Sequence, residues 1–135
     1  MIIKHSGEVP AQPVTVPGAR NVTMQILLGP QDHCPHFAMR RFTVEPAGYT
    51  PRHQHDYEHE VLVLAGCGAV LGPRGEQRLQ TGDVIYVPAN EIHQFQNRGP
   101  EKFEFICLVP AHVHQPNRQP AVLSGERQVR PQAKR

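Results

Sequence analysis

The chain of 135 residues has no tryptophan, and only 6% of its residues are aromatic. It has no apolar run near the roughly 20 residues that a membrane-spanning helix needs. Its first residues, Met1 to His5, include no long apolar segment of the kind found in secretory signals. We therefore expect a cytoplasmic protein with no membrane partner.

Cysteine is scarce, and the charge is small. Cys34, Cys67 and Cys107 are odd in number and form no Cys-x-x-Cys pair, which argues against a disulfide framework and a thiolate zinc site. The formal net charge is only +2. From His112 onward five Lys or Arg accompany one Glu, without any aromatic residue or dense basic block. We therefore expect no nucleic-acid partner.

Long helical periodicity is also missing. The 14 prolines and 11 glycines are spread along the chain and separate short apolar runs, as in β-strands. This spacing predicts an all-β fold, a single antiparallel β-barrel or jelly roll. We expect the strands at 22–28, 37–45, 58–65, 69–72, 76–80, 83–87, 93–97 and 102–109, the last two pairing around Arg98–Pro100.

The length fits one domain, and both ends differ from its middle. We expect residues 1–111 to form the barrel with an N-terminal arm, and residues 112–135 to form an extended basic, proline-rich tail. The pair His112 and His114 lies in this tail, so we expect both side chains to be solvent-exposed. Because the arm and the sheet edges need covering, we expect a homodimer.

Nine histidines stand out, since average usage gives about three in such a chain. Side chains alternate faces along a strand, so His53, His55 and His59 would share one face. Glu58 and Glu60 would then lie on the opposite face.

A fourth histidine, His93, follows a turn expected at Pro88–Asn90, where asparagine tolerates the left-handed conformation. Imidazoles that converge inside a barrel suit a divalent transition metal.

These two segments resemble the two sequence motifs of the cupin superfamily. The resemblance covers about residues 37–109 and implies the cupin barrel. The matching positions are Gly48, His53, His55, Gly66, Gly82, Pro88, His93 and Asn97.

The chain departs from the cupin motifs in three places. Only four residues separate Gly48 from His53, and Asn90 replaces a glycine. The position that is usually Glu falls on His59 or Glu60, and strand alternation favours His59. Here the sequence also resembles small manganese cupins that use four histidines. We predict the ligands His53, His55, His59 and His93, with Glu60 as the alternative to His59.

The resemblance implies one divalent transition metal per chain, with manganese first and iron, nickel, copper or zinc as alternatives. Four protein ligands on an octahedral ion leave two positions for O2, peroxide or a chelating oxygen substrate. Histidine in place of Glu also removes a carboxylate, which disfavours mechanisms that need a protein base.

We therefore predict an oxygenase- or oxidase-type enzyme, a dioxygenase-like oxidoreductase acting on a small organic substrate. The alternatives are a Lewis-acid isomerase or lyase, and a non-catalytic module that senses a small molecule or a metal.

Further residues are candidates for an aromatic-lined substrate pocket. Strand alternation places Phe95 with His93, and puts Phe105 and Cys107 on one face of the last strand. The resemblance favours Phe105 and Cys107 near the metal and Arg40, rather than Arg41, pointing inward. Plain core packing is the alternative for the two phenylalanines and the cysteine. The candidates are Arg40, Thr50, Phe95, Phe105 and Cys107.

Overall fold

The structure is a computed structural model that describes residues 1–115, so most of the expected C-terminal tail lies outside the described residues. In that range the helical elements are three 3-10 turns, η1 (Ser6–Glu8), η2 (Pro30–Asp32) and η3 (Ala111–His114). The strands are β1 (Gln12–Pro13), β2 (Arg20–Leu28), β3 (Phe37–Tyr49), β4 (His59–Ala65), β5 (Cys67–Gly72), β6 (Gly75–Gln80), β7 (Val84–Val87), β8 (Gln94–Asn97) and β9 (Phe103–Pro110).

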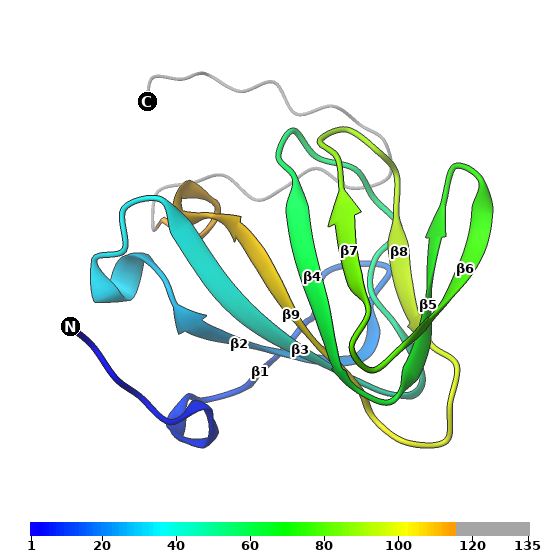
Figure 1. The fold of residues 1–135 in the computed structure, drawn as a ribbon, viewed down its shortest axis with the longest axis horizontal. Coiled ribbons are helices and arrows are strands. Elements are labelled where there is room, and N and C mark those ends of the chain that lie inside the picture. Colours follow the sequence, from blue (N-terminus) through cyan, green and yellow to red (C-terminus); the bar gives the residue numbers. More distant parts are fainter. Residues whose placement is uncertain (116–135) are drawn as a thin grey trace.

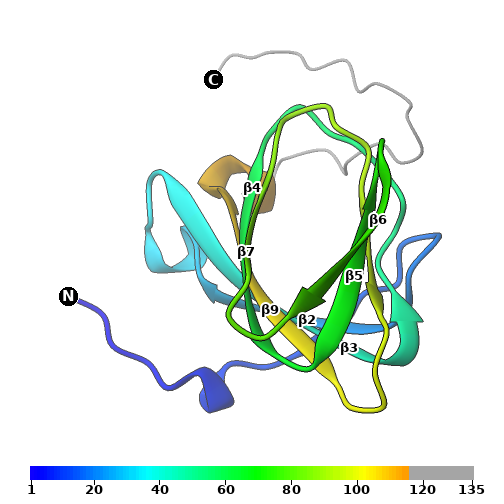
Figure 2. The same cartoon turned by 45° about the vertical axis from the view of Figure 1, so that its right-hand side comes forward.

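The strands form one strongly curled antiparallel sheet in the order β6-β5-β8-β3-β9-β4-β7, with β2 paired to β3 and β1 to β2. Figures 1 and 2 show the curl, which places β4 and β7 opposite the β5–β6 hairpin. The predicted all-β barrel is confirmed. In residues 1–115 no helix is long and apolar enough to cross a membrane.

Alternation of apolar residues explains the curl of the sheet. In β9 every second residue, from Phe103 to Val109, is buried, and in β4 the buried residues are His59, Val61 and Val63. The two strands are paired, with Val61 opposite Cys107. Burial of one face of each strand favours a sheet that wraps around its own apolar side chains.

The expected pairing of the last two strands is wrong. β8 lies between β5 and β3, whereas β9 lies between β3 and β4. The turn between them is held by Asn97, whose side-chain amide donates to the carbonyls of Val44 and Glu101, both at 2.8 Å. Its side-chain oxygen accepts from the Gly99 N–H at 2.8 Å. These bonds lead the chain across the barrel instead of closing a hairpin.

β3 extends past the expected end at residue 45. It continues through Pro46 to Tyr49, and Ala47 adopts a positive φ of 67°. Its register with β2 shifts there, from Val44 opposite Val22 to Tyr49 opposite Arg20. A bulge of this kind lets a strand bend without ending. The bend directs the chain into the loop that carries His53 and His55.

Candidate metal centre

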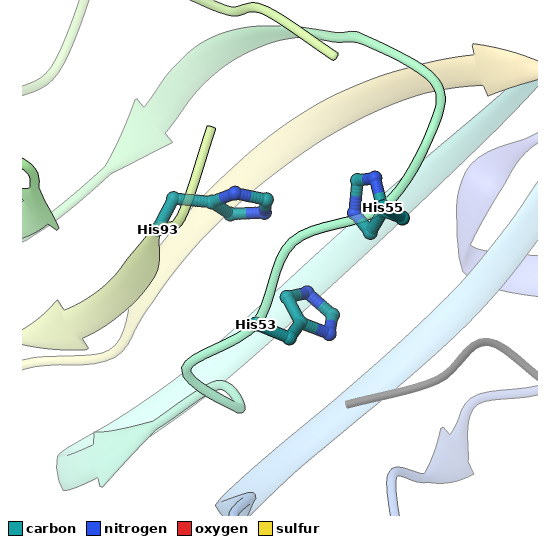
Figure 3. A group of neighbouring side chains, drawn as sticks. All are labelled: His53, His55 and His93. Carbon is teal, nitrogen blue, oxygen red and sulfur yellow. The ribbon is translucent and has the colours of Figure 1, made fainter. Parts of the chain in front are cut away.

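Three histidines converge at one end of the barrel. The ligand nitrogens of His53, His55 and His93 all lie within 4.8 Å of one another. Figure 3 shows that His53 and His55 come from one loop and His93 from a separate segment. The two predicted motifs are therefore brought together in space.

Backbone hydrogen bonds hold the two segments together. His53 and His93 form an isolated antiparallel bridge, with N···O distances of 3.1 and 2.9 Å. The Asn90 N–H donates to the His55 carbonyl at 2.7 Å, and Asn90 has the left-handed φ of 67° expected at this turn. The strand expected at 58–65 is observed as β4, which begins at His59, so His53 and His55 lie in the loop that precedes it. The rings of His53 and His55 are therefore oriented by this loop and not by strand alternation.

His59 lies beside this group and Glu60 does not. His59 is 5% exposed, and its Nε2 lies 2.9 Å from Nε2 of His55. Its ring centroid is 5.1 Å from that of His93. Glu60 is exposed on the opposite face of β4, where it is paired with Tyr86 and Leu108. The expected inward orientation of His59 is confirmed, while its role as a ligand stays a prediction.

The hydrogen bonds of the imidazoles leave nitrogens available for a metal. Nδ1 of His55 lies 3.0 Å from the Tyr57 carbonyl, and Nδ1 of His93 lies 2.8 Å from the Glu91 carbonyl. A carbonyl only accepts, so each Nδ1 carries the proton and each Nε2 keeps its lone pair. Nδ1 of His53 is buried and has no hydrogen-bond partner within residues 1–115. This donor set fits a divalent transition metal.

The electrostatics keep these imidazoles neutral. Burial is the main cause that lowers the pKa of His53 to about 3 and that of His55 to about 4. The pKa of His59 is well below its usual value, and that of His93 is lowered, again mainly by burial. Neutral imidazole is the form that binds metals, so protons compete with a metal only in acid.

Arg40 and Cys107 extend the cluster into the barrel. The Cys107 sulfur lies 3.1 Å from Nη2 of Arg40 and 3.2 Å from Nδ1 of His59. Both side chains are buried, at 8% and 2% exposure. Burial raises the pKa of the Cys107 thiol, and the Arg40 guanidinium acts in the opposite direction. The inward orientation expected for both residues is therefore observed.

Phe95 and Phe105 form an aromatic wall next to the histidines. Their ring centroids lie 4.8 Å apart, and Phe105 also stacks on Phe42 at 5.2 Å. Phe95 lies 6.3 Å from the His93 ring. Thr50, one of the pocket candidates, is buried. Its hydroxyl accepts from the Phe95 N–H at 2.9 Å, which ties the histidine loop to β8.

Sequence reasoning missed two residues of the site. Tyr57 stacks on His55 with a centroid distance of 3.9 Å and an interplanar angle of 6°. Glu91 brings a carboxylate near the site, and its charge acts to raise the pKa of His93. Each lies two residues from a histidine of the site, and that proximity in the sequence was the available signal. His112 and His114, both expected in solvent, are instead partly buried, and the ring centroid of His112 lies 6.4 Å from that of Tyr57.

A cavity of about 280 Å³ reaches His93, one of the clustered histidines. It lies between the β5–β6 hairpin and β7, and His93 and Glu91 are part of its lining. The other lining residues include Val70, Gln77, Ile85 and Tyr86. A small molecule in this cavity would contact both a histidine and a carboxylate.

Known proteins share this fold. The polyketide cyclase RemF from Streptomyces resistomycificus has a similar structure, with a TM-score of 0.80 and 30% identity over 91% of this chain and 84% of that one. A cupin-2 domain from Rhodospirillum rubrum has a TM-score of 0.72 and 25% identity, over 92% of this chain and 80% of that one.

A third relative is the 1-methylthio-D-xylulose 5-phosphate methylsulfurylase of Rhodospirillum rubrum. It is 29% identical over 97 residues, which span 72% of this chain and 61% of that protein. The family model of the cupin domain matches residues 40–109, just over half of the chain. That range includes the four clustered histidines, Arg40 and Cys107, and the chain belongs to the cupin family.

Proposed function

We propose that this chain is a mononuclear metal-dependent enzyme that acts on a small oxygen-containing organic substrate. The observation that carries the proposal is the convergence of His53, His55 and His93, whose ligand nitrogens lie within 4.8 Å of one another. Nε2 of His59 also lies 2.9 Å from Nε2 of His55. The four histidines would hold one divalent transition metal, with manganese as the first choice and iron, nickel, copper or zinc as alternatives. When bound, such a cation supplies Lewis-acid polarisation of a substrate oxygen or, if it is redox-active, electron transfer with O2.

The residues around the histidines would orient the substrate and transfer protons. Phe95 and Phe105 belong to the buried core, with Phe42 packed against it, and these rings would present an apolar wall to the carbon skeleton of a substrate at the histidines. Glu91 lines the cavity together with His93 and is the carboxylate placed to accept or hold a proton at that end. The sequence disfavoured mechanisms that need a protein base, because histidine replaces the usual Glu ligand. Glu91 supplies a carboxylate, so that objection no longer applies.

Lewis-acid chemistry on a carbonyl or enol is the form of the reaction that has most support. The similar structure at 30% identity is a polyketide cyclase, and the relative at 29% identity is a methylsulfurylase. Neither name describes an oxygenation. The proposal therefore favours the Lewis-acid alternative over the oxygenase predicted from the sequence.

An oxygenase remains the second candidate because of the aromatic wall. Phe95 and Phe105 are 4% and 2% exposed, and they place apolar surface next to the histidines. Such a wall suits O2 and an apolar substrate equally well.

Metal content and oxygen uptake test both candidates together. Protein reconstituted with Mn²⁺ or Fe²⁺ should contain one metal per chain by mass spectrometry of the metal. It should then convert enolisable 1,3-dicarbonyl compounds without consuming O2 at an oxygen electrode. O2 uptake in proportion to conversion would favour the oxygenase. A stoichiometric metal without any conversion would favour the non-catalytic sensing module.

We also propose the homodimer expected from the sequence. The outer face of β4 and β7 exposes Leu62, Val84 and Tyr86, at 41%, 77% and 63%. Contiguous exposed apolar side chains are typical of an interface between subunits. Light scattering should give twice the chain mass. A monomer at roughly tens of micromolar protein would contradict the proposal.

A further inference from the structure

Arg40 is a buried positive charge whose partners among residues 1–115 are neutral. It is 8% exposed, its Nη2 donates to the Cys107 sulfur at 3.1 Å, and its guanidinium lies 4.9 Å from the Phe42 ring centroid. Its Nε is buried and has no hydrogen-bond partner within residues 1–115. Burial of a charge is costly unless an opposite charge accompanies it. The guanidinium is therefore only partly satisfied by the protein.

The adjacent Arg41, by contrast, has a carboxylate partner. Arg41 points to the outer face of β3, where its Nε donates to a carboxylate oxygen of Glu104 at 3.1 Å and its Nη2 pairs with the same oxygen. Within residues 1–115, a carboxylate pairs with the partly exposed Arg41 and none pairs with the buried Arg40. A buried guanidinium without a carboxylate partner indicates a binding site for a negative charge carried by a ligand.

Arg40 also lies beside the candidate metal centre. The Cys107 sulfur contacts both Nη2 of Arg40 and Nδ1 of His59, at 3.1 and 3.2 Å. A divalent cation held by neutral imidazoles would add positive charge next to the guanidinium. Glu91, which lines the cavity, is a carboxylate whose charge acts on His93 of this cluster. A bound cation and Arg40 together would leave this side of the barrel cationic.

We infer that the site takes a small organic anion, a carboxylate or an enolate. One of its oxygens accepts hydrogen bonds from the Arg40 guanidinium, and a neighbouring oxygen faces the histidine cluster. This inference rests on the proposed function and names the substrate class of the same site. It also assigns Arg40 as the residue that distinguishes an anion from a neutral analogue.

Binding of two probes to the Mn²⁺-loaded protein tests the assignment. Oxalate is a chelating anion, and imidazole is a neutral ligand that needs no partner for a negative charge. Calorimetry should measure both affinities in the wild type, in Arg40→Met and Arg40→Lys, and in the matched control Arg41→Met. Metal content and thermal stability are measured on the same samples, so that a variant that fails to fold or to hold metal is recognised.

The inference predicts a selective loss. Oxalate affinity should fall by at least about tenfold in Arg40→Met, because a hydrogen bond to a charged group is lost. It should fall less in Arg40→Lys, which keeps the charge, and should stay near the wild-type value in Arg41→Met. Imidazole affinity should be unchanged in all three variants.

Two results would overturn the assignment. One is an unchanged oxalate affinity in metal-loaded Arg40→Met, and the other is an equal loss for oxalate and imidazole. If the methionine variant does not fold, the same comparison is made on the lysine variant. A wild-type protein that binds no metal would overturn the proposed function itself, which separates the two failures.

Discussion

The inner and outer faces of β3, β4 and β9 are made by the same three strands but differ in chemistry. We define the inner face as Arg40, His59, Val61, Phe105 and Cys107, and the outer face as Arg41, Glu60, Leu62 and Glu104. On the inner face a charge lies among neutral groups, and His59 is held neutral by burial. On the outer face Arg41 is paired with Glu104, and Glu60 is exposed. Strand alternation thus separates a reactive surface from a solvated one within single strands.

The pair His59 and Glu60 gives the largest expected contrast between the two faces. His59→Ala should weaken metal binding by more than about tenfold, because an inward nitrogen is lost, whereas Glu60→Gln should leave it nearly unchanged. Metal titration of both purified variants measures the difference. The opposite order would show that the outward residue holds the metal and that the inner face is wrongly assigned.

The two cysteines Cys107 and Cys67 give a smaller contrast. Cys107→Val removes the sulfur that contacts His59 Nδ1, and metal affinity should fall by about tenfold, the size expected for a group that orients a ligand. Cys107→Ser, which keeps a hydrogen-bonding atom, should recover part of the loss. The matched control is Cys67→Val, because Cys67 is exposed on β5. Equal affinities in the two valine variants would contradict the role given to Cys107.

Acid should destabilise the metal-free protein through the buried histidines His53 and His55, which lie in the loop before the inner face of β4. The pKa values of His53 and His55 are lowered to about 3 and about 4, below their ordinary value of 6.5. Between these values the unfolded chain binds more protons than the folded one, so stability falls as the pH falls. Tm measured with a chelator present should therefore be lower at about pH 4.5 than at about pH 7. This range runs from above the ordinary pKa to just above the lowered pKa of His55. The drop should shrink in His53→Gln, and a constant Tm would argue against neutral, buried imidazoles.

The outer ion pair should matter least. Arg41→Met removes a pair between partly exposed side chains, at 30% and 19% exposure, so the free energy of unfolding should change by less than about 1 kcal/mol. Urea denaturation measures this change. A loss of more than about 2 kcal/mol would mean that the outer face contributes as much as a buried contact.

Strand alternation and residue-type preferences predicted well which side chains of the regular strands point inward and where a turn adopts a positive φ. The alternation in β4 correctly separated His59 from Glu60, because a paired strand follows period two. The positive φ of Asn90 followed from the residue type. The inward side chains of β9 also followed from alternation together with the family resemblance.

Features that depend on distant contacts were not predictable. The path from β8 to β9 is set by Asn97 donating to the Val44 carbonyl, a contact between residues 53 apart in sequence. The stacking of Tyr57 on His55 arises in an irregular loop, where no periodicity applies. The hydroxyl of Thr50 similarly bonds to Phe95, 45 residues away. Sequence patterns name the residue types at such positions but not the partner that fixes them.

The backbone bridge between His53 and His93 has a consequence for how the protein exchanges its metal. Because the two segments are joined by N–H···O bonds at 3.1 and 2.9 Å, their relative position is set by the polypeptide and needs no ion. Removing the cation should therefore leave a folded protein with an intact receptor. Different divalent ions should then replace one another in native buffer, at rates set by passage through the cavity and not by refolding. The identity of the bound ion would in that case follow the supply of ions in the surroundings.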